Sequence, residues 1–246
     1  MADSNKETAV GLIHECAVLY SQNLCGRMVM FITENDHRTA FFETLFLSRN
    51  YLHLTGVRTN LNSEFFYEIA LNQRLSPSSV TFDPGGTTEI KLGILRQLMS
   101  IHVSARMVGD YDNSRPLLIT DKIAGTVTVA MGFLYVDGLY IPNTALKMDV
   151  RDVTAKATRR KVVAIFVKPR EDALYSQLSY IAKGMSVDDP MLASILRMKV
   201  NMSNLYAEFP IPMKRSIPQQ LVIAESETTE NCQTECERLL KKDNQD

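Results

Sequence analysis

Residues 161–168, KVVAIFVK, form a near-continuous apolar run with a lysine at each end. β-Branched and aromatic residues dominate the run, as they do in strands. The run lacks the alternation of a half-exposed strand, and this is typical of a strand that is buried on both faces. It therefore predicts the central strand of a sheet.

The first hundred residues carry apolar side chains at helical spacing. We expect helices at residues 7–23, from a cap at Asn62 or Ser63 to Leu75, and from a cap at Thr87 or Thr88 to Ile101. Residues 41–48 are expected to form a further helix that leads into a strand at 51–60.

Strand patterns dominate after residue 102. Strands are expected at 27–33, 103–111, 117–119, 125–133, 139–141, 161–168 and 177–181. Asp137-Gly138, between FLYV and LYI, predicts a hairpin. A last helix is expected over 190–206, with a core side of Met191, Leu192, Ile195, Leu196 and Met198. The order predicts an α+β fold, with N-terminal helices packed on a mainly antiparallel sheet and a C-terminal helical extension.

The formal net charge of −1 over 246 residues excludes a generally basic nucleic-acid-binding protein but not a local basic face. No apolar run approaches the roughly 20 residues that span a bilayer, and residues 1–10 do not resemble a secretory signal. We therefore expect a cytoplasmic protein that does not enter membranes. The four cysteines lack the spacing of a zinc site, so we expect reduced thiols and no metal.

Residues 51–60, YLHLTGVRTN, place groups that can move protons or hold phosphate inside an apolar run. These groups are His53, Thr55 and Arg58, and Gly56 allows a turn or a close approach of the backbone to a ligand. The same pattern also fits a buried strand end with one hydrogen-bonded histidine.

Residues 141–170 form a basic segment. Eight cations, Lys147, Arg151, Lys156, Arg159, Arg160, Lys161, Lys168 and Arg170, stand against Asp149 and Asp152, so the local charge is +6. A phosphate backbone would explain this asymmetry, because cations release counterions when they bind it. The segment also fits a solvated loop that the acidic C-terminal residues balance.

Two further motifs hold polar side chains. Pro142 precedes Asn143 and Thr144, where a strand is expected to end. If YSQLSYIAK is a strand, a period of two places Tyr175, Ser179 and Lys183 on one face, either in a polar cleft or on the solvent side of a sheet.

Serine-hydrolase, Walker and dinucleotide motifs are absent, as are carboxylates at metal-ligand spacing. Metal-free acid–base chemistry with cationic assistance remains, and RNA cleavage through the 2′-hydroxyl is its plainest example.

The order of several motifs resembles the phage-linked branch of the barnase–EndoU–colicin–RelE-like nuclease domains over roughly residues 27–184. The motifs are YLHLTGV, VGDYDNSR, DKIAGTVTVAMGF, YIPNTALKMDVRD, KVVAIFVKPR and YSQLSYIAK. The resemblance implies a small α+β fold with RNA on an exposed sheet face, and a ribonuclease-like activity that needs no metal or cofactor. We expect a nuclease-type domain over 1–184, a helical extension packed on it over 185–215 and a charge-rich tail over 216–246.

The resemblance also implies roles for residues. His53 would be the acid–base group, with Thr55 positioning it or the phosphate, and Tyr175 and Lys183 would join them as catalytic candidates on the far wall beside Ser179. The nucleic-acid-binding set would be Arg58, Asn143, Thr144, Lys147, Arg151, Arg159, Lys168 and Ser179, where Asn143 and Thr144 shape the cleft. The alternative is a non-catalytic factor on the same scaffold that binds a host or phage protein or a nucleic acid, with homodimerisation as one use of its C-terminal part.

Overall fold

The computed structural model describes residues 2–112 and 118–207. The longer helices and the strands, in chain order, are α1 (Ala2–Asn23), β1 (Arg27–Asn35), β2 (Arg38–Leu45), α2 (Asn50–Thr55), α3 (Ser63–Leu71), α4 (Thr87–Leu98), α5 (Ile101–Ser104), β3 (Met107–Asp110), β4 (Lys122–Gly125), β5 (Ala130–Val136), β6 (Leu139–Leu146), α6 (Val150–Val153), β7 (Arg160–Pro169), β8 (Gln177–Ile181), α7 (Ala193–Lys199) and β9 (Tyr206–Ala207). Three short 3₁₀ turns, η1 (Pro77–Ser79), η2 (Lys156–Thr158) and η3 (Met202–Asn204), complete the set for the described residues.

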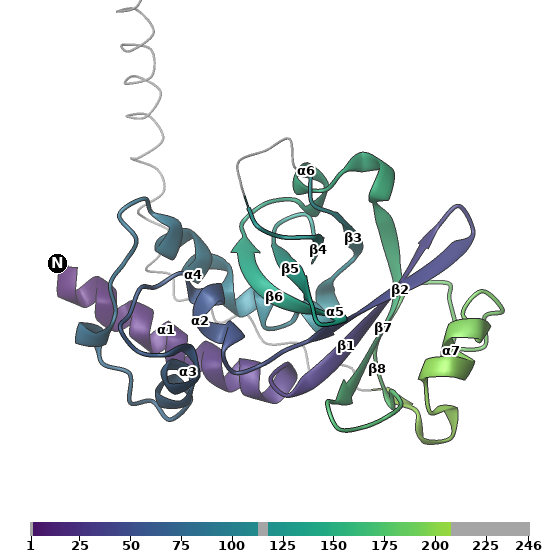
Figure 1. Ribbon diagram of the computed structural model, residues 1–246, viewed down its shortest axis with the longest axis horizontal. Coiled ribbons are helices and arrows are strands. Elements are labelled where there is room, and N and C mark those ends of the chain that lie inside the picture. Colours follow the sequence, from purple (N-terminus) through teal and green to yellow (C-terminus); the bar gives the residue numbers. More distant parts are fainter. Residues whose placement is uncertain (1, 113–117, 208–246) are drawn as a thin grey trace, which may run out of the picture. The chain divides into compact units, whose positions relative to one another are not determined.

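Seven of the strands close into a ring. The order is β1-β2-β6-β5-β4-β3-β7, and β7 pairs with β1 again, while β8 and β9 continue from β7 (Figure 1). The contact between β2 and β6 is parallel and consists of one pair, Thr44 with Tyr140, whereas the other pairs within the ring are antiparallel. The fold is α+β with a mainly antiparallel sheet, as the sequence predicted.

Strand β7 is the apolar run that the sequence singled out, and it is central. It pairs with β1 along one edge, and with β3 and then β8 along the other. Residues 162–168 of β7 are all buried. The prediction of a strand covered on both faces is confirmed.

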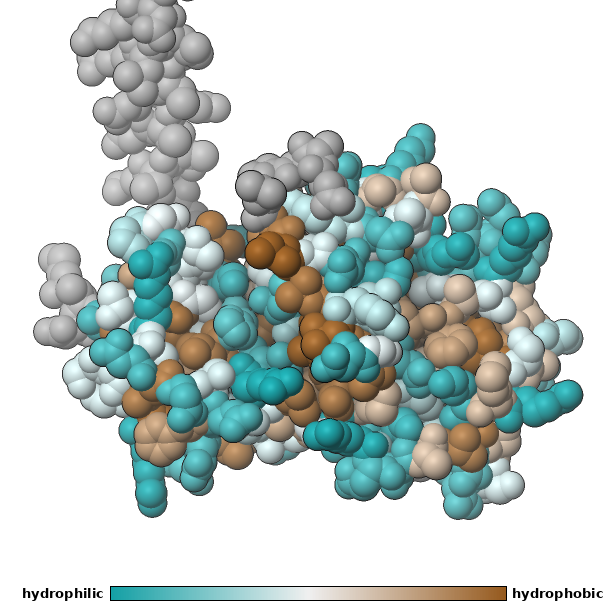
Figure 2. Space-filling view, viewed as in Figure 1, coloured by the Kyte–Doolittle hydropathy of each residue, from teal (hydrophilic) through white to brown (hydrophobic). Residues whose placement is uncertain are grey.

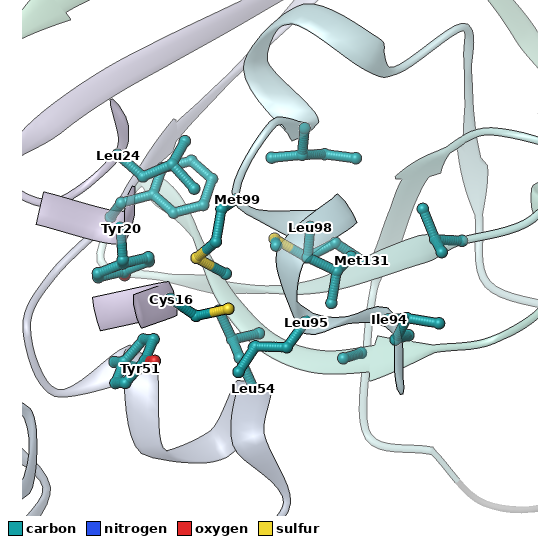
Figure 3. Close-up of a cluster of buried hydrophobic side chains, with 14 of the residues drawn as sticks. Cys16, Tyr20, Leu24, Tyr51, Leu54, Ile94, Leu95, Leu98, Met99 and Met131 are labelled. Carbon is teal, nitrogen blue, oxygen red and sulfur yellow. The ribbon is translucent and has the colours of Figure 1, made fainter. Parts of the chain in front are cut away.

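Different helices cover the two faces of this strand. On one face, helices α1, α2 and α4 and the ring interior share a core, in which Cys16, Tyr51 and Leu95 meet Met131 of β5 (Figure 3). On the other face, Phe166 of β7 packs with Leu192 and with residues of α7. Figure 1 shows α1–α4 on one side of the ring and α7 on the opposite side.

The region around residues 41–60 differs from the expectation. Residues 41–45 lie in strand β2, where Phe42 stacks on Phe31 of β1 with ring centroids 4.8 Å apart, and residues 50–55 form helix α2. The expected order of helix and strand was therefore wrong. Gly56, at a φ of 71°, ends the helix as a left-handed cap, so its position marks a helix C-terminus and not a strand end.

Several boundaries were also wrong. The segment expected as one strand over 125–133 is split, because Thr126 turns the chain by accepting hydrogen bonds from the backbone N–H of Thr128 and Val129. Residues 101–104 belong to helix α5, and 118–119 are not in a strand. The helix expected over 190–206 is helical only at 193–199 before η3, and Met198 is 60% exposed instead of lying in the core.

Other local predictions are confirmed. The Asn62 side chain caps α3 by accepting a hydrogen bond from the backbone N–H of Phe65 at 2.8 Å. Asp137 and Gly138 both adopt positive φ, 50° and 88°, in the turn between β5 and β6. The expected cap of α4 at Thr87 or Thr88 was wrong, because the cap is Gly86 and the buried Thr88 hydroxyl bonds the backbone of Gly56 and Asp83.

Candidate functional site

Helix α2 carries His53 on its exposed side while Tyr51, Leu54 and Thr55 are buried. The imidazole therefore faces solvent and does not lie in the core. Thr55 has a local structural role: its hydroxyl donates to the carbonyl of Leu52 at 2.7 Å and accepts from the backbone N–H of Val57 at 3.3 Å.

The chain after His53 is fastened to the start of α4. Lys91 Nζ donates to the His53 carbonyl at 3.0 Å, and Thr88 Oγ1 donates to the Gly56 carbonyl at 2.7 Å. A Cβ on Gly56 would meet Lys91 Cδ at 2.8 Å, so the close approach requires glycine. Burial lowers the pKa of Lys91. This contact sets an ammonium group beside the backbone of His53.

Arg58 is exposed and pairs with Asp83 in the loop before α4. The backbone of Arg58, five residues after His53, pairs with Thr81, which lies two residues before Asp83. The ion pair therefore lies near the end of α2, the helix that carries His53. A phosphate that bound Arg58 would have to compete with this carboxylate.

Asn143 occupies a β-bulge. Gly132 of β5 pairs with Thr144 and Phe133 pairs with Pro142, so Asn143 is the extra residue of β6. Its Nδ2 donates to the Ile119 carbonyl at 2.5 Å and its Oδ1 accepts from Thr120 at 3.3 Å. The bulge thus turns the amide of Asn143 toward the segment before β4.

The motifs around His53 and Asn143 are brought together. Asn50, the first residue of α2, donates from Nδ2 to the carbonyl of Pro142 at 3.1 Å. Thr144 is buried against Gly132, where a Cβ would meet its methyl group at 2.7 Å. Two segments that are 92 residues apart in sequence therefore lie side by side.

Three of the eight cations of the basic segment, Arg151, Arg159 and Lys168, are engaged within the protein. Arg151 Nε lies 3.0 Å from both carboxylate oxygens of Asp149, and hydrogen bonds from Arg151 lower the pKa of Asp149. The Arg159 guanidinium donates to the carbonyls of Thr154 and Arg151, whereas Lys147 is exposed.

The residues on and around β8 do not share one face. Ile165 of β7 pairs with Tyr180 and Phe166 pairs with Leu178, so Ser179 is a bulge residue that interrupts the expected period of two. Ser179 is buried and its hydroxyl has no partner within the described residues, whereas Lys183 is exposed.

Tyr175 and Lys168 are buried before β8. Tyr175 donates to Glu43 at 3.0 Å, and Lys199 of α7 binds the same carboxylate at 2.9 Å. Burial, and then the Glu43 charge, raise the pKa of Tyr175 well above its usual value. Lys168 Nζ donates to the carbonyls of Asp172 and Ala173 at 2.5 and 3.0 Å.

A cavity of about 240 Å³ opens at one end of the ring. Its lining includes Asp110, Lys122 and Arg160, together with Phe42 and Thr33. Lys122 Nζ lies 2.6 Å from Asp110 Oδ1.

Comparison with family models gives a match over residues 12–184 of the 246 residues, to the family described as phage-Barnase-EndoU-ColicinE5/D-RelE like nuclease4. The chain belongs to this family. No curated protein and no solved structure matches the chain.

The region matched by the phage nuclease-like family includes all twelve site residues expected from the sequence, together with the ring and the cavity at its end.

Among residues 2–112 and 118–207, no helix is long and apolar enough to cross a membrane, and no three metal-binding side chains gather in one place. Cys16 and Cys25 are free thiols, whereas Cys232 and Cys236 lie outside the described residues.

Sequence reasoning missed Lys91, Asp110 and Lys122 as site candidates and counted Arg160 only within the basic segment. Lys91 follows a helical pattern like any exposed lysine, and only the contact with His53 distinguishes it. The other three residues come from the ends of β3, β4 and β7, so no sequence spacing connects them.

Proposed function

We propose that this protein acts on RNA and cleaves it without a metal, with His53 as the acid–base group. The observation that carries the proposal is membership of a nuclease-like family over 12–184. Exposure of the His53 imidazole supports it, because a general base must reach the proton that it removes. In this reaction the 2′-oxygen attacks the phosphorus, the 5′-oxygen leaves, and a proton passes from the first to the second through acid–base groups.

Cations near His53 would stabilise the charged phosphorane. Lys91 is held at the His53 carbonyl, and Arg58 lies five residues farther along the chain. Asn143 and Thr144 would border the substrate, since Asn50 bonds the neighbouring Pro142. Lys147, Arg151, Arg159 and Lys168 would contribute to the field that attracts the RNA backbone. Because Tyr175 and Ser179 are buried, only the exposed Lys183 of the three expected far-wall residues would contact RNA.

The test is cleavage of labelled RNA in EDTA by the wild type, His53→Ala and His37→Asn. His37 is an exposed histidine at a φ of 61° between β1 and β2, where asparagine is well tolerated, so it is the matched control. We expect His53→Ala to lose cleavage by a factor of about 10² or more, while His37→Asn retains it. Equal cleavage by all three proteins would refute the role of His53, and loss of activity in EDTA would refute the metal-independent mechanism.

A second candidate function is a non-catalytic factor that binds a host or phage protein, or a second copy of this chain. The observation that favours it is an exposed apolar strip on the outer side of the β5–β6 hairpin, visible in the middle of Figure 2. The strip consists of Val136, which is 43% exposed, and the half-buried Leu134, Leu139 and Ile141, beside Ile119, which is 80% exposed. Exposed patches of this kind commonly mark protein interfaces.

This second function is tested by Val136→Lys. Loss of dimerisation in light scattering, or loss of capture of a purified candidate partner, would support it if the melting temperature is unchanged. A folded wild-type protein that cleaves RNA would favour the first function.

A further inference from the structure

The cavity of about 240 Å³ lies where several strands of the ring begin or end on the same side. Its walls come from the last residues of β1 and β3 and the first residues of β2, β4 and β7, together with η2. Its lining includes Phe42, Asp110, Lys122, Ala157, Thr158 and Arg160. It is therefore an open mouth of the closed ring, a common place for ligand sites in barrels.

A series of aromatic contacts leads from Phe42, which lines the mouth, to Tyr140 and Tyr135, which lie beyond its lining. Phe42 is 5% exposed and lies against Phe31, and Tyr140 meets Phe42 edge-on with centroids 5.5 Å apart. Tyr135 lies 5.0 Å from Tyr140 and is 57% exposed. Phe42 is covered by these contacts, so the ring that this series offers to a ligand is the exposed Tyr135, and exposed aromatic faces stack nucleobases regardless of sequence.

Two cations face the same space. Lys122 is paired with Asp110, and its ammonium lies 5.5 Å from the centre of the Tyr140 ring. Arg160 lines the cavity and has no hydrogen-bond acceptor or carboxylate partner among the described residues. With Lys122 and Arg160 against Asp110, the lining carries a net charge of +1. The guanidinium of Arg160 is thus available to an anion.

The basic segment adds to this charge. The turn η2, Lys156–Thr158, forms part of the wall through Ala157 and Thr158. Lys156 is exposed next to this wall. Thr158 holds the wall in place, because its hydroxyl accepts a hydrogen bond from the backbone N–H of Asp110 at 2.9 Å.

We propose that this mouth binds one nucleotide of a single-stranded nucleic acid, with a phosphate at Arg160 and the base against the aromatic series. The choice of nucleic acid as ligand rests on the proposed function, but the site is separate from His53. The volume supports a single nucleotide, since it lies below the roughly 300–1,000 Å³ of sites for drug-sized ligands. Arginine can also donate two parallel hydrogen bonds to a phosphate, so the guanidinium of Arg160 favours a phosphate as its ligand.

The experiment measures binding of a fluorescent 2′-O-methyl oligoribonucleotide by anisotropy. This probe lacks the 2′-hydroxyl nucleophile, so binding is measured without cleavage. We compare the wild type with Arg160→Gln, Tyr135→Ser and Lys161→Gln. Lys161 is the matched control, because it is the exposed next residue of β7, loses the same charge and does not line the cavity.

We expect Arg160→Gln to weaken binding about tenfold or more. The plot of log binding constant against log salt concentration should also become less steep by about one, as expected for the loss of one phosphate contact. Tyr135→Ser should weaken binding at least about fivefold with little change in the salt slope. Lys161→Gln should remain within about twofold of the wild type.

Equal binding by Arg160→Gln and the wild type, with thermal melts that show both folded, would overturn the proposal. So would equal losses for Arg160→Gln and Lys161→Gln, since these would indicate a diffuse field without a site. Displacement of the probe by an acidic peptide more readily than by unlabelled RNA would also overturn it. RNA cleavage that persists while Arg160→Gln binds normally would defeat this proposal alone, whereas a binding defect in a protein that never cleaves RNA would defeat only the proposed function.

Discussion

Replacement of Gly56 by alanine tests the contact that holds the end of α2, which carries His53, against Lys91 of α4. Gly56 has a φ of 71°, and an added Cβ would meet Lys91 Cδ at 2.8 Å and Lys91 Cβ at 3.3 Å. The left-handed backbone costs an L-residue about 1–2 kcal/mol, from which the lower entropy of the unfolded alanine chain recovers about 0.4–1 kcal/mol. The displaced Lys91 also loses its bond to the His53 carbonyl, which is worth about 1 kcal/mol.

We therefore expect Gly56→Ala to lower the free energy of unfolding by about 2 kcal/mol, or the melting temperature by about 4–8 °C. The control is Gly26→Ala, at a φ of 74° with no atom within 4 Å of the added Cβ, for which only the backbone part, about 1 kcal/mol, is expected. Urea unfolding measures both. In a Lys91→Ala background, the loss from Gly56→Ala should fall to the level of Gly26→Ala. Equal losses for the two glycines, or no coupling to Lys91, would refute the reasoning.

Two further predictions concern buried polar groups. Tyr175→Phe should destabilise the protein by about 2 kcal/mol in urea unfolding, because it removes a hydrogen bond to the mostly buried carboxylate of Glu43. Lys199 then remains as the partner of that carboxylate. The control, Tyr135→Phe on the surface, should have no effect. Burial lowers the pKa of His102 to about 4, so the unfolded chain binds a proton between pH 4 and 6.5 that the folded chain does not. Stability should fall as pH decreases through this window, by about 3 kcal/mol for this group, and His102→Gln should remove that part of the slope; an unchanged slope would contradict it.

Local signals predicted the elements whose determinants are contiguous in sequence. The apolar run of β7, the Asp137-Gly138 turn and the Asn62 cap each depend on a few adjacent residues. Closure of the ring depends instead on the single pair between Thr44 and Tyr140, which are far apart in the chain, and no periodicity encodes it.

The site was harder to predict for two physical reasons. Bulges at Asn143 and Ser179 shift the side chains by one residue, and a period-two pattern contains no sign of such a shift. Long-range partners also occupy groups that look free in the sequence, as Glu43 does for Tyr175. The exposure of His53 could have been inferred only with α2 recognised as a helix, where Tyr51 and Leu54 take the buried side.

The shared edge of β7 has a consequence for local unfolding. Strands β3 and β8 follow each other along one edge of β7, whereas β1 covers the other edge. The layer of β8 and α7 can therefore open without breaking the ring, and its amide protons should exchange with solvent at a lower free energy than those between β1 and β7. We therefore expect the layer of β8 and α7 to exchange by local opening, and the ring to exchange only when the whole domain unfolds.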